Sequence, residues 1–162
     1  MAASNATLHM MCGKIAAGKS TLSARLGEAK NTIVISEDRW IAELYQGDLT
    51  TLGDYFQRSD RLRATLTAHI VDLLRAGVSV VLDFHANTIG ARCWMRRLFE
   101  EGRTPHQLHF LDVPDEACRA RLHARIAAGT PGVSDEEFDH ITSFFVPPDP
   151  SEGFNIIRHG EG

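Results

Sequence analysis

The sequence predicts an α/β fold in which a mainly parallel sheet of five strands lies between layers of helices. Short runs rich in β-branched and other apolar residues alternate with stretches of helical periodicity, which is typical of βαβ units. A glycine-rich loop follows the first apolar run and precedes a helical stretch, the arrangement of a phosphate-binding loop. Because no internal repeat or low-complexity tract interrupts this order, we expect residues 1–162 to form a single domain.

Five apolar runs are the predicted strands of this sheet. The clearest is VSVVLD, a continuous apolar run of the kind buried on both faces of a parallel sheet. The last run, NIIRH, is short and is expected at an edge. The predicted strands cover residues 7–12, 32–36, 78–83, 107–113 and 155–159.

Helical spacing and capping residues predict the helices between these strands. Leu62, Leu66 and Ile70 recur at helical spacing, and Gly77 ends that helix. Asp115 is expected to be the N-cap of another helix. The predicted helices cover residues 20–29, a segment from about 40, 54–76, 92–102, a segment from 115 and a short one from about 135.

Composition and charge disfavour nucleic acid and membranes as partners, although a local basic cleft for nucleic acid stays open. Seventeen basic against 21 acidic residues leave a net charge of −4, which creates no overall attraction for DNA or an anionic membrane. No apolar run approaches the roughly 18 residues that a membrane span needs. The three cysteines are odd in number and lack metal-type spacing, so we expect buried, reduced thiols and a cytoplasmic protein.

The stretch GKIAAGKST fills the pattern G-x-x-x-x-G-K-[ST] of a loop that binds nucleotide phosphates. Its glycines let backbone N–H groups wrap an anion where a side chain would block the approach. Lys19 is expected to act on the β- and γ-phosphates, and the hydroxyl of Ser20 to ligate Mg²⁺. The predicted ATP-binding loop comprises Gly13, Lys14, Ile15, Ala16, Ala17, Gly18, Lys19, Ser20 and Thr21.

A second acid is needed beside this loop to hold Mg²⁺. Asp83 ends an apolar strand, the arrangement that places a carboxylate next to such a loop, and it is the favoured candidate. Asp112, which ends the run HFL, is the competing candidate. The alternative for Asp83 is a carboxylate that caps the next helix.

The rest of the chain favours phosphoryl transfer over a switch or a motor. It lacks the N-K-x-D stretch with which GTPases recognise guanine, and Phe84 and His85 follow Asp83 where a motor has a water-orienting acid. Kinase catalysis consists mainly of positioning and charge neutralisation, which a short chain can supply. We therefore expect an ATP- and Mg²⁺-dependent kinase that phosphorylates a hydroxyl of a small molecule.

Two charged residues follow the second predicted strand, at the edge where ligands bind in open α/β sheets. Asp38 is the candidate general base, and Arg39 is expected to hold the acceptor or a phosphate. The alternative is that Ser36, Glu37 or Asp38 caps the helix that begins near Trp40.

Two late arginines are the predicted catalytic cations. Arg121 and Arg125 stand four residues apart, on one face of a helix. Together with the Gly- and Pro-containing segment that follows, they predict a lid over about 119–134 whose guanidinium groups neutralise the γ-phosphate. The alternative is a solvated face paired with Asp115 and Glu116.

The segment after Asp83 supplies further candidates for contact with the acceptor or a phosphate, namely His85, Asn87 and Arg92. A structural role is the alternative for His85. Four aromatic residues are expected either to wall the acceptor pocket or to belong to the core: Trp40, Tyr45, Tyr55 and Phe56.

Taken together, these motifs resemble the small P-loop kinases that include zeta toxins, chloramphenicol phosphotransferase, gluconate kinase-like enzymes and the kinase domain of polynucleotide kinase. GKIAAGKST is similar to their phosphate loop, VISEDRW to their second-strand segment and GVSVVLDFHANT to their second acidic strand. LDVPDEACRARLHAR resembles their lid helix, and VSDEEFDHITSFFVPPDPSEGF resembles the tail of the group.

This resemblance implies a three-layer, adenylate kinase-like P-loop NTPase fold with a short helical lid, in the AAA-type ATP-binding group. It places the base on Asp38 and the paired lid arginines on Arg121 and Arg125. It also implies that adenine lies between the lid helix and residues 145–156. The dipeptide Phe84-His85 departs from the more polar pair of the family, in a region that faces the acceptor.

Two other functions stay open. One is a polynucleotide or nucleotide-sugar kinase, although a net charge of −4 disfavours the basic track that a polynucleotide needs. The other is a non-catalytic ATP-binding regulator, which the presence of Asp38 and both lid arginines disfavours. The sequence predicts no oligomeric state.

Overall fold

The computed structural model describes residues 5–160, in which five strands form one sheet in the order β2-β3-β1-β4-β5. All four strand pairings in these residues are parallel, so the sheet predicted as mainly parallel is parallel throughout. Parallel neighbours require crossover connections, which the helices provide. The strands are β1 (Leu8–Cys12), β2 (Thr32–Ser36), β3 (Ser79–Asp83), β4 (His106–Leu111) and β5 (Ile156–His159).

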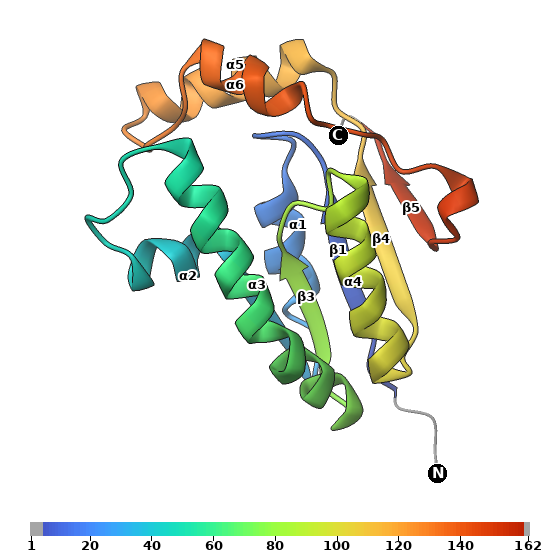
Figure 1. The fold of residues 1–162 in the computed structure, drawn as a ribbon. Helices are drawn as coiled ribbons and strands as arrows, with labels where there is room; N and C mark the ends of the chain where they lie inside the picture. Colours follow the sequence, from blue (N-terminus) through green and yellow to red (C-terminus); the bar gives the residue numbers. More distant parts are fainter. Residues whose placement is uncertain (1–4, 161–162) are drawn as a thin grey trace.

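The helices form the outer layers of a three-layer arrangement. Figure 1 shows α3 and α4 over one face of the sheet and α1 behind it, while α5 and α6 cross above the carboxyl ends of the strands. No helix within residues 5–160 is long and apolar enough to cross a membrane. The helices are α1 (Lys19–Leu26), α2 (Glu37–Leu44), α3 (Leu52–Arg75), α4 (Ile89–Gly102), α5 (Asp115–Ala127) and α6 (Asp135–Thr142).

Local capping explains where the helix boundaries differ from those predicted. The helix expected from about residue 40 begins at Glu37, because the side chain of Ser36 accepts a hydrogen bond from the Arg39 amide. The long helix begins at Leu52, because Thr51 and Asp54 form a capping box. Asp115 is the first residue of α5 rather than its N-cap, a position that Pro114 occupies.

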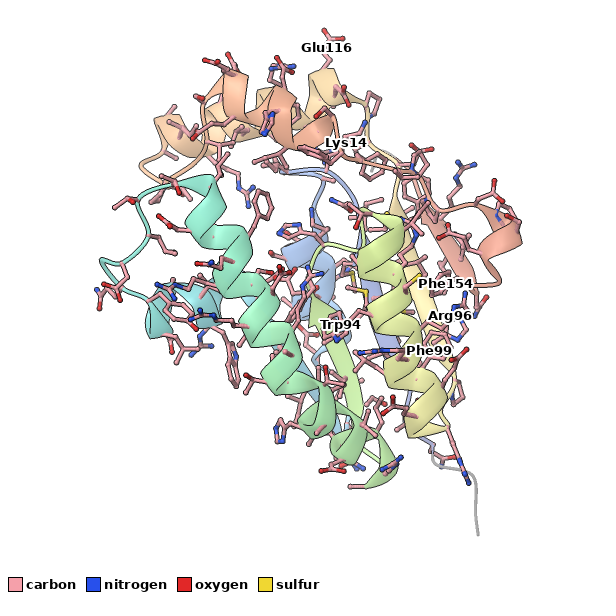
Figure 2. All side chains as sticks on the ribbon, viewed as in Figure 1. Lys14, Trp94, Arg96, Phe99, Glu116 and Phe154 are labelled. Atoms are coloured by element: carbon pink, nitrogen blue, oxygen red, sulfur yellow. The ribbon has the colours of Figure 1, made fainter. Side chains whose placement is uncertain are left out.

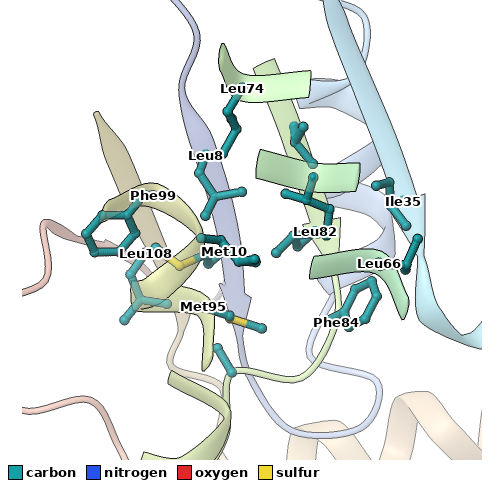
Figure 3. Packing of buried hydrophobic residues seen from close by; sticks show 14 of the residues in the cluster. Leu8, Met10, Ile35, Leu66, Leu74, Leu82, Phe84, Met95, Phe99 and Leu108 are labelled. Carbon is teal, nitrogen blue, oxygen red and sulfur yellow. The ribbon is translucent and has the colours of Figure 1, made fainter. Parts of the chain in front are cut away.

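Alternation along the strands divides the core into two apolar clusters. Leu8, Met10 and Leu82 pack with α3 and α4 on one face of the sheet (Figure 3). Met11 and Val81 belong to the cluster on the other face. Burial on both faces explains the continuous apolar runs in the sequence. The rigid sheet that results presents the carboxyl ends of β1, β2 and β3 at one edge.

The cysteines are only in part as predicted. Cys12 and Cys118 are buried, and burial raises the pKa of the Cys12 thiol to about 12. Cys93, however, lies exposed on α4, so the expectation of three buried thiols is wrong at that position.

Candidate active site

The loop between β1 and α1 has the backbone shape of an anion cradle. Ala16 and Gly18 adopt positive φ angles of 61° and 104°, and turns that combine left-handed with right-handed residues point successive N–H groups to one side. A Cβ at Gly13 would lie 3.1 Å from the Cβ of Ala17 and 3.2 Å from that of Leu111. Both glycines of the motif are therefore needed, one for its conformation and one for close packing. The amino terminus of α1 adds its dipole at the same place.

Lys19 is held beneath this loop. Its side chain is buried, and its ammonium donates hydrogen bonds to the carbonyls of Gly13 (2.6 Å) and Lys14 (2.8 Å). Burial lowers the pKa of Lys19 to about 8, against the opposing attraction of Asp83 and Asp38. A phosphate in the loop would give this desolvated cation an anionic partner, so the site fits the group that the motif predicts.

The oxygen ligands predicted for Mg²⁺ lie side by side. The Ser20 hydroxyl donates to Oδ2 of Asp83 at 2.9 Å, because β3 is the neighbour of β1 and ends beside the loop. A hydroxyl and a carboxylate are the oxygen donors that Mg²⁺ takes. Asp112 instead pairs with Arg158 of β5 at 3.3 Å, outside the cavity described next. The geometry therefore favours Asp83 over Asp112 beside Ser20.

A cavity of about 800 Å³ extends from the phosphate loop to the first turns of α3. Its walls combine the loop with residues after β2 and β3, the face of α3 and the segments flanking α6. Figure 1 shows α5 and α6 above the phosphate loop and α3, and Figure 2 shows Lys14 just below these two helices. Loop residues that line it are Lys14, Ile15, Ala16, Gly18, Lys19, Ser20 and Thr21, while Gly13 and Ala17 lie behind it.

Asp38 faces this cavity from the start of α2. Its carboxylate accepts a hydrogen bond from the Tyr55 hydroxyl, and Nε2 of His85 lies 3.9 Å from its Oδ1. The interaction with His85 is the main cause that lowers the pKa of Asp38 to about 2. Ser36 is the N-cap of α2, as the capping alternative predicted, and Asp38 nevertheless lines the cavity.

An ion pair that the sequence did not indicate joins Glu37, the residue before Asp38, to α3. Glu37 is completely buried and accepts hydrogen bonds from the Ser59 hydroxyl and from Nε (3.1 Å) and Nη2 (3.4 Å) of Arg63. Arg63 also lies over the rings of Phe84 and Trp94. One face of α3 forms a wall of the cavity, and the helical spacing of its residues is the sequence signal that could have identified this wall. These residues are Leu52, Tyr55, Phe56, Ser59, Asp60 and Arg63.

Asn87 joins the segment after β3 to the phosphate loop. Its amide oxygen accepts a hydrogen bond from the Gly13 amide at 2.9 Å, and its amide nitrogen donates to the Gly13 carbonyl at 2.8 Å. His85 and Asn87 both line the cavity, as predicted for residues near the acceptor. The two hydrogen bonds to Gly13 give Asn87 a further role in holding the loop.

Two predicted acceptor contacts are placed elsewhere by the structure. Arg92 is 1% exposed and pairs with Glu152 at 2.8 Å, because its guanidinium joins α4 to the C-terminal segment. Arg39 points into solvent and pairs with Glu43 on the next turn of α2. Neither lines the cavity, which corrects the expectation that they contact the acceptor.

The predicted lid is divided between α5 and the loop that follows it. Arg125 lines the cavity, while Nη1 of Arg121 approaches the carbonyl of Ala17 at 3.4 Å outside its lining. Asp115, the alternative ion-pair partner, pairs with Lys14. Residues 130–133 of the expected lid and 144–145 beyond α6 also line the cavity.

Comparisons with known proteins agree with this architecture. A family model described as an AAA domain matches residues 8–148. Solved structures with the same fold include a protein from Chloroflexus aurantiacus (TM-score 0.79, 17% identity, 98% of this chain and 87% of that one). A gluconokinase from Sinorhizobium meliloti has a TM-score of 0.60 at 18% identity, covering 99% and 84% of the two chains. The APS kinase CysC of Mycobacterium tuberculosis has a TM-score of 0.60 at 20% identity, covering 96% and 88%. No curated protein matches the sequence.

Proposed function

Because this chain belongs to the AAA domain family of ATP-binding P-loop kinases, we propose that it transfers the γ-phosphoryl group of ATP to a hydroxyl of a small molecule. The observation that carries the proposal is the position of Asp38 in the same cavity as the phosphate loop. Lys19, Ser20 and Asp83 line one part of that cavity, and Asp38, Tyr55 and His85 line another. A donor and an acceptor can therefore meet within one cavity.

The proposed ATP side of the cavity combines cationic side chains with oxygen ligands for Mg²⁺. Lys19 and Arg125, with Arg121 behind the loop, provide positive charge for the triphosphate. Ser20 and Asp83 would hold Mg²⁺, which supplies charge neutralisation and orientation of the phosphates when bound. Gluconokinase and APS kinase, two proteins of similar fold, are named for phosphorylating small molecules, which supports this assignment.

Asp38 is proposed to orient the acceptor hydroxyl and to take its proton. The acceptor oxygen forms a bond to the γ-phosphorus, the bond from that phosphorus to the β–γ bridging oxygen breaks, and ADP leaves. A pKa of about 2 makes Asp38 a weak base, so it is ionised throughout the neutral range and receives the proton late, when the oxygen is already bonding to phosphorus. The hydroxyl of Tyr55 and the ring of His85 hold the carboxylate in place.

The direct test is detection of a phosphorylated product. The protein is incubated with Mg²⁺ and ATP against a panel of hydroxyl compounds, and products are identified by mass spectrometry and ³¹P NMR. Substitution Asp38→Asn should lower kcat by about 10²- to 10⁴-fold, the usual contribution of a general base. ATP binding should be almost unchanged, because the substitution leaves the phosphate loop intact.

Asp48→Asn, an acid-to-amide change in the exposed turn after α2, is the matched control and should keep full activity. An Asp38→Asn protein with wild-type kcat on its acceptor would remove the proposed base. ATP binding without a phosphorylated product from any acceptor would favour the non-catalytic regulator. Phosphorylation of a 5′-hydroxyl oligonucleotide in preference to small molecules would favour a polynucleotide kinase.

A further inference from the structure

We infer that the acceptor is a hydroxyl compound carrying a protonated amine, recognised by Phe56 and Asp60 on α3. This inference rests on the proposed function, since it concerns the acceptor side of the same cavity. Three observations carry it: the ion pairing of Arg63 on the acceptor wall, an unpaired carboxylate on the same wall, and an exposed aromatic ring one turn from that carboxylate.

The acceptor side of the cavity offers no unpaired lysine or arginine among the described residues. Arg63 is the basic residue on this wall, and the Nε–Nη2 edge of its guanidinium donates to both carboxylate oxygens of Glu37, which neutralises its charge. Lys14 is paired with Asp115. The remaining basic residues of the lining, Lys19 and Arg125, belong to the phosphate loop and α5, where we place the triphosphate. A carboxylate or phosphate on the acceptor would therefore lack a partner and would face Asp38.

Negative charge, in contrast, is available on this wall. Asp60 lines the cavity, is exposed, and makes no ion pair in the part of the chain that the structure describes. With Arg63 paired to Glu37 and His85 beside Asp38, the carboxylate of Asp60 leaves an unbalanced negative charge on the acceptor side. Such a wall attracts a cationic acceptor and repels an anionic one.

Phe56 completes the recognition site. Phe56 and Asp60 stand four residues apart on α3, so their side chains are neighbours on one helix face. The Phe56 ring is 47% exposed although it lines the cavity, and it packs edge-on against Tyr55. An aromatic face beside a carboxylate binds an ammonium by cation–π and ionic attraction together. Leu52, one turn earlier, extends the apolar surface toward the acceptor's carbon skeleton.

The test compares acceptors that differ in one substituent. We would use 2-amino-3-phenylpropan-1-ol, its 2-methyl analogue and its 2-carboxylate analogue, with a second triplet of 4-aminobutan-1-ol, pentan-1-ol and 5-hydroxypentanoate. Phosphorylation is followed by mass spectrometry, and binding by calorimetry in the presence of Mg²⁺ and a non-hydrolysable ATP analogue. Within a triplet, the amine should have the highest kcat/KM and the tightest binding, at least tenfold above the carboxylate.

Two variants assign this preference to its residues. Asp60→Asn should raise the KM of the amine about three- to fivefold, as expected for an exposed ion pair, and leave the KM of the neutral analogue within twofold. Phe56→Leu, which keeps an apolar side chain, should weaken the amine about two- to fivefold. Asp72→Asn, the same change on an exposed position of α3 far along the helix, is the control and should alter neither value.

The outcomes separate the inference from the proposed function. A carboxylate acceptor that outperforms its amine partner would overturn the inference while the protein remains a kinase. The inference would also be overturned if Arg97→Gln, in the adjoining groove between α3 and α4, selectively raised the KM of an anionic acceptor. Amine binding that depends on Asp60, with no phosphorylated product from either triplet, would keep the recognition site and count against the proposed function.

Discussion

Lys19 shows how a single residue acquires its chemistry from its place in the fold. The sequence contains three lysines, and the structure buries this one under the phosphate loop with carbonyl oxygens as its hydrogen-bond partners. Neutral carbonyls compensate the lost hydration only in part, so burial lowers the pKa of Lys19 to about 8. A bound triphosphate would favour the charged form and raise that pKa again.

ATP binding should therefore take up protons in mildly alkaline solution. At pH 8.5 free Lys19 is deprotonated in about three-quarters of the molecules, whereas the complex holds the proton, so uptake approaches that fraction. Calorimetric titrations in two buffers of different ionisation enthalpy measure the uptake. Lys30→Met, at an exposed lysine, should leave it unchanged. Binding with no proton uptake between pH 8 and 9 would contradict the assignment of the low pKa to this site.

At the scale of elements, three neighbouring strands bring histidines from distant parts of the sequence into one row. His109 of β4 hydrogen-bonds through its ring nitrogens to His9 of β1 at 3.1 Å and to His159 of β5 at 2.9 Å. His109 is 3% exposed, and burial, with the charges of the two neighbouring rings, lowers its pKa to about 4. The folded protein therefore keeps this imidazole neutral in conditions where an unfolded chain would protonate it.

Stability should consequently fall as the pH is lowered from about 6.5 to about 4. In that range the unfolded state binds a proton at His109 that the folded state excludes, which costs up to about 1.4 kcal/mol for each pH unit. Urea unfolding at several pH values should show a smaller acid loss for His109→Gln than for wild type. His69→Gln, at an exposed position on α3, should keep the wild-type slope. If the free energy of unfolding fell equally with pH in wild type and His109→Gln, His109 would not be the cause of the loss of stability in acid.

The elements themselves were largely predictable from the sequence, because each carries a local signal. Apolar runs identified all five strands, and the glycine-rich motif identified the loop. The wall of α3 was not identified, although its residues recur at helical spacing. Polar and aromatic residues at that spacing occur on any exposed helix face, and only the position of α3 opposite the phosphate loop makes this face part of a cavity.

At the scale of the whole molecule, Arg92 links α4 to the end of the chain. Its guanidinium donates hydrogen bonds to the carboxylate of Glu152, 60 residues later, and to the carbonyls of Ala86 and Val146. Arg96, one turn on, lies over the ring of Phe154 at 4.4 Å; Figure 2 shows these two side chains near Phe99. The C-terminal segment thereby keeps the residues after α6 against the cavity.

Removing the Arg92 side chain should therefore lower the stability of the protein more than its affinity for the acceptor. Arg92→Leu leaves Glu152 without its partner and should lower the free energy of unfolding by about 3 kcal/mol or more, the usual cost of breaking a buried pair. Arg39→Leu, which breaks an exposed pair on α2, should cost about 0.5 kcal/mol or less. Urea unfolding measures both values. A stable Arg92→Leu protein with a raised acceptor KM would instead support a contact between Arg92 and the acceptor.

Sequence alone was enough to predict the succession of strands and helices along the chain, the phosphate loop and the candidates Lys19, Ser20, Asp83 and Asp38. These follow from periodicity, turn chemistry and a motif whose spacing has a direct physical reason. The contacts between distant elements came only from the tertiary structure: Asp83 rather than Asp112 lies beside Ser20, Arg92 is buried against the C-terminal segment, and α3 lines the cavity. The physical reason is that an ion pair or a cavity wall depends on which elements become neighbours, and distance along the chain does not specify that.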